Sequence, residues 1–242
     1  MPKTVAIIQA RLGSDRLPGK VLLDLDGQPM LNWVVRRVRR AKSIDQVVIA
    51  TTDHPRDQRL VEYCKRQEWP VFVGPERDVL TRYLGAAKEF SATEIVRITS
   101  DCPLIDPSVI DDVVGLFKPS VEFDYCCNFF PNRTYPRGLD VECLSLAALQ
   151  HADRLATTSE LREHVTLAIY RNPTQFRIGS TTSQQDFSSW RWTVDTADDL
   201  LLIRSILAEF HDDRFSWLDV VQAYNNHPCW HQINSHIRQR AA

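Results

Sequence analysis

The sequence lacks an excess of either charge and any long hydrophobic run. Its 242 residues carry 29 Lys and Arg against 31 Asp and Glu, a formal net charge of −2, so no basic field favours general nucleic-acid binding. No apolar stretch approaches the roughly 20 residues of a membrane span, and the first one is broken at Gln9, too soon for a signal peptide. We therefore expect a cytoplasmic protein with neither nucleic-acid nor membrane partners.

Cysteine is present without a metal-binding arrangement. The six cysteines form no C-x-x-C pair and no Cys/His cluster of the zinc type. The adjacent Cys126 and Cys127 would point to opposite faces of a strand, and a chain of this length has no need of disulfides. We expect reduced cysteines without a catalytic role, of which Cys102 alone lies beside a candidate site.

Short apolar segments alternate with longer amphipathic ones. Strands are expected at residues 5–9, 46–51, 71–73, 95–99, 124–128 and 176–179, and helices at 29–41, 56–67, 78–89, 107–117, 145–156, 160–170, 197–209 and 217–225. The alternation predicts an α/β fold with a mainly parallel sheet, and residues 1–242 as one domain. Residues 123–144 interrupt it and indicate an inserted β-hairpin that covers a site or makes a subunit contact.

Two segments are expected to have no chemical role. Arg36, Arg37, Arg39 and Arg40 surround an apolar helix stripe, which favours a solvated outer face over a phosphate site. Residues 227–242 contain histidines but no dense ligand spacing.

A basic, glycine-bearing loop follows the first expected strand. It contains Arg11, Arg16, Lys20, Gly13 and Gly19 within RLGSDRLPGK. Ligands bind at the carboxyl ends of strands in open parallel sheets, and such a loop suits an anion. The glycines are separated by five residues and no Ser or Thr follows the lysine, so the segment is neither a P-loop nor a G-x-G-x-x-G motif. The alternative is a surface loop whose cations pair with nearby acids.

Two acids far apart in the sequence also occupy strand-end or helix-start positions. Asp101 follows the strand at 95–99, and Asp195 precedes the helix at 197–209. Two carboxylates that converge with phosphate oxygens suit Mg²⁺. Helix capping is the competing explanation for each acid, and it is preferred for Asp106 and Asp198.

These motifs together carry a family resemblance. The opening QARLGSDRLPGKVL resembles the A-R-x-x-S-x-R-L-P-x-K signature of the CMP-sugar synthetases, and SDCPLID and VDTADDL resemble their metal-bearing and late aspartate segments. DVLTRY, YPRGLDVE and REHVT are similar to patterns of the spore-coat-polysaccharide-type cytidylyltransferases. The resemblance implies a Rossmann-like nucleotidyltransferase fold.

It also implies roles for individual residues. Arg11, Arg16 and Lys20 would hold the CTP triphosphate, Ser14 would donate a hydrogen bond, and Asp101 and Asp195 would hold Mg²⁺. The predicted nucleotide-binding set is Ala10, Arg11, Leu12, Gly13, Ser14, Arg16, Lys20, Asp78, Arg82 and Thr99. The base is expected near Asp78 and Arg82, although Asp78 is also a plain N-cap candidate. Ser100, Arg97 and Thr99 depart from the residues usual in CMP-Kdo synthetases.

An acceptor is expected at the inserted segment and one helix. The candidate residues are Tyr135, Arg137, Asp140, Glu142 and His164. A turn at residues 136–138 explains the proline and glycine there equally well, and a lone helical histidine is more often structural.

The leading hypothesis is a Mg²⁺-dependent, homodimeric cytidylyltransferase that transfers CMP from CTP to a small acidic sugar or similar acid and releases pyrophosphate. Arg11, Lys20, Asp101 and Asp195 are its expected catalytic residues. One alternative is a glycosyltransferase of related fold, but Asp101 belongs to no Asp-x-Asp pair. A nucleotide-binding module without catalysis is the other alternative, and triphosphate binding alone would not need both acids.

Overall fold

A seven-stranded, mainly parallel sheet forms the centre of the computed structural model, which describes residues 2–117, 122–210 and 212–238. The strand order is β5-β4-β1-β6-β8-β7-β9, and only β8 is antiparallel to its neighbours. The strands are β1 Thr4–Gln9, β4 Gln46–Thr52, β5 Val71–Gly74, β6 Glu94–Thr99, β7 Tyr125–Cys127, β8 Glu142–Ser145 and β9 Ile178–Ser180. The expected fold class is confirmed. A small ribbon of β2 Asp24–Leu25 and β3 Gln28–Pro29 stands apart.

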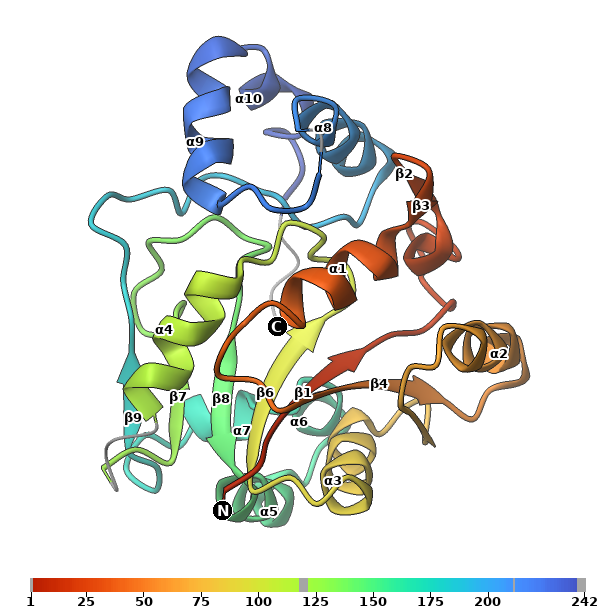
Figure 1. Cartoon of the computed structure of the whole chain (residues 1–242). Coiled ribbons are helices and arrows are strands. Elements are labelled where there is room, and N and C mark those ends of the chain that lie inside the picture. Colours follow the sequence, from red (N-terminus) through yellow and green to blue (C-terminus); the bar gives the residue numbers. More distant parts are fainter. Residues whose placement is uncertain (1, 118–121, 211, 239–242) are drawn as a thin grey trace.

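Helices cover both faces of this sheet (Figure 1). One core contains residues of α1 Met30–Val38, α2 Gln58–Arg66, α4 Pro107–Phe117, α8 Ala197–Leu207 and α9 Trp217–Asn226. The other contains residues of α3 Val79–Glu89, α5 Leu146–Leu155 and α7 Leu167–Tyr170. In β1, Ala6 and Ile8 face the first core whereas Val5 and Ile7 face the second. This explains why residues 5–8 of the strand are all apolar.

The helix expected at residues 160–170 is broken in two. The structure has α6 Ser159–Glu163 and α7 Leu167–Tyr170, with Val165 between them at φ 48°. A β-branched residue rarely adopts this left-handed conformation, and no pattern in the sequence predicts the break. The apolar spacing continued through the break because Leu161 and Val165 both pack in the second core. The break places His164 at the end of α6.

The prediction that Arg37 lies on a solvated outer face is wrong, because the residue is buried. Its guanidinium is fully buried and donates to the carbonyl oxygens of Ile105 at 2.6 Å, Asp213 at 2.8 Å and Phe215 at 3.1 Å, with Asp106 at 3.4 Å. Burial lowers its pKa to about 10. The side chain therefore ties α1 to the segment that follows Asp101 and to the start of the C-terminal region.

The interrupting segment at residues 123–144 is part of the main sheet. β7 and β8 are antiparallel neighbours, as a hairpin requires, but β8 also pairs with β6. The connection between them is held by Asn128, which donates to the Leu139 oxygen at 2.7 Å and accepts from the Val141 nitrogen at 2.9 Å. The strand pair is thus continuous with the sheet, and it is the connecting segment that reaches the carboxyl end of β6.

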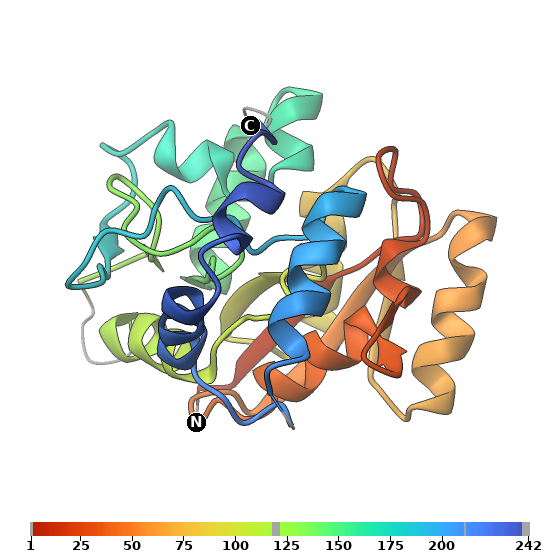
Figure 2. The same ribbon diagram turned by 90° about the horizontal axis from the view of Figure 1, so that it is seen from above.

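The C-terminal helices gather beyond the end of the sheet to which β1 and β6 point (Figures 1 and 2). They are α8, α9 and α10 Trp230–Ile233. The short helical turns η1 Lys20–Leu22 and η2 Pro55–Asp57 complete the described elements. None of the helices in the described residues is long and apolar enough to cross a membrane.

Candidate active site

A polar cleft of about 320 Å³ opens at the carboxyl ends of β1 and β6, where Gln9 and Thr99 are paired across the two strands. We call it the basic cleft because its walls carry Arg11, Arg16, Lys20, Arg82 and Arg97. The cleft therefore brings the loop after β1, the start of α3 and the end of β6 together. Of the predicted nucleotide-binding and metal residues, those that line it are Ala10, Arg11, Ser14, Arg16, Lys20, Arg82, Thr99, Asp101 and Asp195.

Lys20 joins the two separated acids. Its Nζ lies 2.8 Å from Oδ2 of Asp101 and 2.9 Å from Oδ1 of Asp195, and it donates to the Val194 oxygen at 2.8 Å. All three ammonium protons are therefore used. Burial disfavours the charged ammonium, but attraction by the two carboxylates outweighs it and raises the pKa of Lys20. Burial likewise opposes ionisation of Asp101, yet Lys20 holds the pKa of this carboxyl below its ordinary value.

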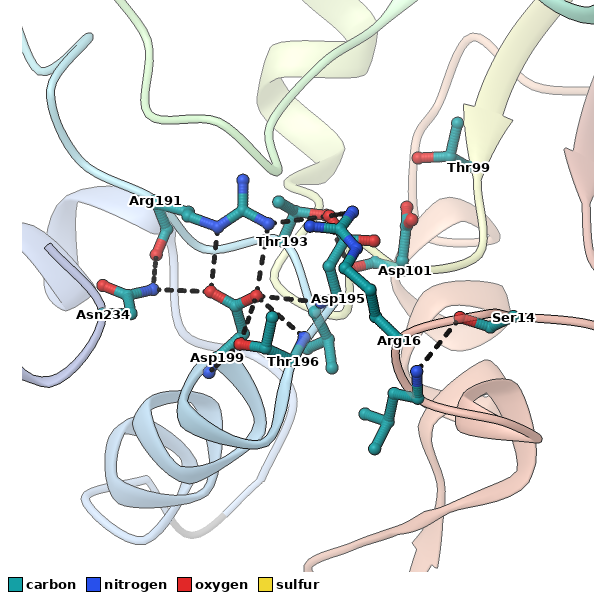
Figure 3. Close-up of polar contacts among 12 residues, drawn as sticks. Ser14, Arg16, Thr99, Asp101, Arg191, Thr193, Asp195, Thr196, Asp199 and Asn234 are labelled. Atoms are coloured by element: carbon teal, nitrogen blue, oxygen red, sulfur yellow. Dashed lines mark hydrogen bonds and ion pairs between the residues drawn. The ribbon is translucent and has the colours of Figure 1, made fainter. Parts of the chain in front are cut away.

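The other oxygen of Asp195 is bound by two arginines. Oδ2 lies 3.0 Å from Arg16 and 2.7 Å from Arg191. Figure 3 places these side chains around Asp195. Arg191 also pairs with the fully buried Asp199 at 2.9 Å. Asp195 thus contacts three cationic side chains, those of Arg16, Lys20 and Arg191. It could bind a metal ion only if one of these contacts were lost.

The loop after β1 is shaped by a buried carboxylate. Asp57 accepts the backbone N–H of Leu12 at 2.6 Å and the hydroxyl of Thr52. The loop closes through Gly19, whose φ of 71° suits glycine and whose N–H donates to the Leu12 oxygen at 2.9 Å. A Cβ on Gly13 would lie 2.9 Å from the Arg56 guanidinium, so this glycine makes room for Arg56. Leu12 and Gly13 support the loop and are not among the residues that line the cleft.

Arg82 and Asp78 behave differently at the start of α3. The Arg82 side chain is 2% exposed, donates to the Pro75 oxygen at 2.8 Å, and leaves its Nε without a hydrogen-bond partner in the described structure. Burial lowers the pKa of this guanidinium. Asp78 caps α3 by accepting the Thr81 N–H at 2.8 Å and pairs with Arg162 at 2.6 Å, outside the cleft lining. The capping explanation holds for Asp78, whereas Arg82 presents a poorly compensated cation.

A second cleft of about 290 Å³ adjoins the first, and we call it the side cleft. It shares Arg16, Thr99, Asp101, His164 and Asp195 with the basic cleft and adds Cys102, Arg137, Gly138, Asp140 and Thr193. Asp101 and Asp195 therefore lie where the basic cleft and the side cleft meet. Asp140 is bound by Arg133 at 2.8 Å, whereas burial and the neighbouring Arg133 lower the pKa of Arg137.

Two residues expected at the acceptor are placed elsewhere. Tyr135 is 5% exposed and packs against Trp217, with ring centroids 5.3 Å apart. Glu142, at the start of β8, is buried and binds Arg97 and the Tyr125 hydroxyl. Neither lines the side cleft, because the first belongs to the core and the second neutralises an arginine under the basic cleft.

Asp101 and Asp195 are the residues that would hold a divalent metal. No group of three or more His, Cys, Asp or Glu side chains suited to a metal occurs among the described residues. Two carboxylate oxygens bound to a common nitrogen do fit Mg²⁺, which takes one or two carboxylates together with phosphate oxygens and water.

Sequence reasoning missed three residues that organise this site. Asp57 shapes the loop, and Arg191 and Asp199 fix Asp195. The only available signal was the four-residue spacing of Arg191, Asp195 and Asp199, which predicts neighbours only if the segment is helical. The segment before Asp195 is not helical and Arg191 forms an isolated bridge with Arg137, so the spacing alone does not predict these contacts.

Comparison with known proteins gives the family. Residues 5–215 match the family model described as cytidylyltransferase. The chain is 34% identical to the spore coat polysaccharide biosynthesis protein SpsF of Bacillus subtilis over 208 residues, 83% of this chain and 84% of that protein.

Solved structures of similar proteins support the same family. A cytidylyltransferase from Leptospira borgpetersenii superposes with a TM-score of 0.91 at 31% identity, covering 100% of both chains. A CMP:2-keto-3-deoxy-manno-octonic acid synthetase complexed with CTP shares the fold, with a TM-score of 0.66 at 19% identity over 86% of this chain and 99% of that one. The match to the family model over most of its length, with these relatives, places the chain in the cytidylyltransferase family and makes it a CTP-dependent nucleotidyltransferase.

Proposed function

We propose that this enzyme transfers CMP from CTP to an acidic sugar, with Mg²⁺ held at Asp101 and Asp195, and releases pyrophosphate. The observation that carries the proposal is the position of these two acids at the junction of the basic and side clefts, joined by Lys20. The similarity to SpsF favours an acceptor used in making surface polysaccharide.

The basic cleft would take the nucleotide. Arg11, Arg16 and Lys20 face it from one loop and match a triphosphate in charge. Arg82 is buried and forms no ion pair with the residues that the structure describes, a costly state that a hydrogen bond to an oxygen of the nucleotide would relieve. Lys20 would have to exchange a carboxylate contact for a phosphate oxygen when CTP binds.

The reaction would be an in-line attack by an acceptor oxygen on the α-phosphorus of CTP. Bound Mg²⁺ would neutralise charge that develops on the phosphates. The loop cations would stabilise the departing pyrophosphate, and the walls of the two clefts would align acceptor and nucleotide.

The side cleft would take the acceptor. Arg137 lines it with Arg16 close by, whereas Asp140 is already bound by Arg133. This balance of charges favours a carboxylate-bearing ligand. His164 borders both clefts and would contact acceptor and nucleotide alike.

The test is incubation with each nucleoside triphosphate, Mg²⁺ and a panel of sugar acids. Pyrophosphate release is followed together with the mass of the product. We expect pyrophosphate and a CMP conjugate with CTP only. Sugar transfer without pyrophosphate would indicate the glycosyltransferase alternative, and thermal stabilisation by CTP without turnover would indicate a binding module.

A further inference from the structure

The carboxylate of Asp195 is held from behind by groups that line neither the basic nor the side cleft. Arg191 is 7% exposed and its Nη2 donates to Oδ2 of Asp195 at 2.7 Å. Oδ1 of the same carboxylate faces Lys20 at 2.9 Å, on the side of Asp101. The contact with Arg191, together with that of Arg16 to the same oxygen, therefore leaves Oδ1 directed toward Lys20 and Asp101.

Asp199 fixes Arg191 in turn. Its two oxygens accept from Arg191 Nε at 2.9 Å and Nη2 at 3.2 Å. The same carboxylate accepts the backbone N–H groups of Asp195 and Thr196, each at 3.0 Å. Asp199 thus positions both the main chain of Asp195 and the arginine that holds its side chain (Figure 3).

Asn234 completes this arrangement from the C-terminal segment. It is 5% exposed, follows α10, and its Nδ2 donates to Oδ1 of Asp199 at 2.9 Å and to the Arg191 oxygen at 2.9 Å. The Asn234 amide thus contacts the side chain of Asp199 and the main chain of Arg191, so it sets the position of these two residues relative to each other.

We propose that Asn234, Asp199 and Arg191 are positioning residues that orient Asp195 and thereby set the enzyme's affinity for its divalent metal. This inference rests on the proposed function, since it takes Asp195 as a metal ligand. It assigns a role to a C-terminal segment in which the sequence pattern indicated none. The three residues act through Asp195 and touch no reacting atom.

Capping of α8 alone does not account for the arrangement. Thr196 and Asp199 form a capping box with backbone groups, which needs neither Arg191 nor Asn234. Arg191 adds a contact to Asp195 itself, and Asn234 adds contacts to Arg191 and Asp199. Groups behind a metal ligand typically change metal affinity or activity by about 10–100-fold when they are removed.

Asn234→Ala is the sharpest perturbation because it removes two hydrogen bonds without changing charge or touching either cleft. The matched control is Tyr224→Phe, which removes the 2.9 Å bond between the Tyr224 hydroxyl and Trp192 in the same C-terminal region but leaves Asp195 alone. Thermal unfolding measures the stability of both variants. Binding of Mn²⁺ is measured by electron paramagnetic resonance in the presence of a non-hydrolysable CTP analogue, alongside the Mg²⁺ dependence of turnover.

We expect both variants to lose a similar amount of stability, but only Asn234→Ala to bind Mn²⁺ about tenfold more weakly and to need correspondingly more Mg²⁺. Equal metal affinity in Asn234→Ala and wild type would overturn the inference and leave the proposed function intact. Failure of the wild-type protein to bind Mn²⁺ with the nucleotide analogue would overturn both.

Discussion

Replacing Lys20 by methionine should change how stability depends on pH. In the wild-type protein Lys20 compensates Asp101 and Asp195 together. Arg16 and Arg191 would remain on Asp195 after the replacement, so Asp101 is the carboxylate left without a cation. Methionine preserves most of the buried side-chain volume, which isolates the loss of charge.

The cost follows from the burial of these groups. Breaking a fully buried ion pair costs about 3–5 kcal/mol. The Asp101 side chain is 25% exposed, which allows water to reach it, so we expect about 2 kcal/mol. For a chain of this length that corresponds to a fall in Tm of about 4–8 °C at neutral pH.

The two proteins should then respond differently to acid. In wild type the pKa of Asp101 is held below its ordinary value, so its stabilising contribution is complete above that ordinary value and is lost only as the pH falls through the lower, folded value. In Lys20→Met, burial is opposed only by the hydrogen bonds from Thr99 and Cys102, and we expect it to raise the pKa of Asp101. The variant should therefore gain stability as the pH falls from about 7 to 5, where wild type changes little.

The assay is thermal unfolding at several pH values, with and without Mg²⁺. The control is Lys65→Met on the exposed face of α2, which should match wild type throughout. We also expect Mg²⁺ to stabilise Lys20→Met more than wild type, because the ammonium no longer occupies the space between the acids. A variant as stable as wild type at pH 7, with no gain on acidification, would refute the reasoning.

Three further outcomes are expected. Asp101→Asn should lower the rate of pyrophosphate release by about 10²-fold or more while the exposed Asp212→Asn leaves it unchanged, and a rate near wild type would remove Asp101 from the mechanism. Glu142→Gln leaves the Arg97 charge buried and should cost about 3–5 kcal/mol in denaturant unfolding; an effect confined to the KM for acceptor would instead favour the original acceptor assignment. Ser91→Gly, at an exposed helix end with φ 54°, should stabilise the fold by about 0.5–1 kcal/mol, and a loss of stability would contradict the conformational argument.

The sequence predicted the sheet strands and the position of the basic loop at the carboxyl end of β1, because both depend on short segments. The apolar run at residues 5–8 and the closely spaced cations that follow it can be interpreted without information from distant parts of the chain. The sequence also predicted that Asp101 and Asp195 would converge, since both positions lie at the same end of the sheet.

What it failed to predict depends on partners far along the chain. Arg37 is on the polar side of its helix pattern, but it is buried because carbonyl oxygens near residue 213 accept its hydrogen bonds. Val165 adopts a left-handed conformation that its residue type disfavours. Glu142 and Tyr135 were assigned to an acceptor from their neighbours in the sequence, whereas the register of β8 with β6 places Glu142 opposite Arg97.

The contacts of Arg37 have a consequence for biosynthesis. Its guanidinium binds carbonyl oxygens of residues that are synthesised about 176 positions later, at Asp213 and Phe215. During translation this arginine leaves the ribosome long before these two acceptors exist, and the part of the guanidinium that binds them must stay hydrated until they arrive. We therefore expect nascent chains that end before residue 213 to leave α1 loosely attached, and the loop cations and their acids to reach their final arrangement only once the last helices have emerged.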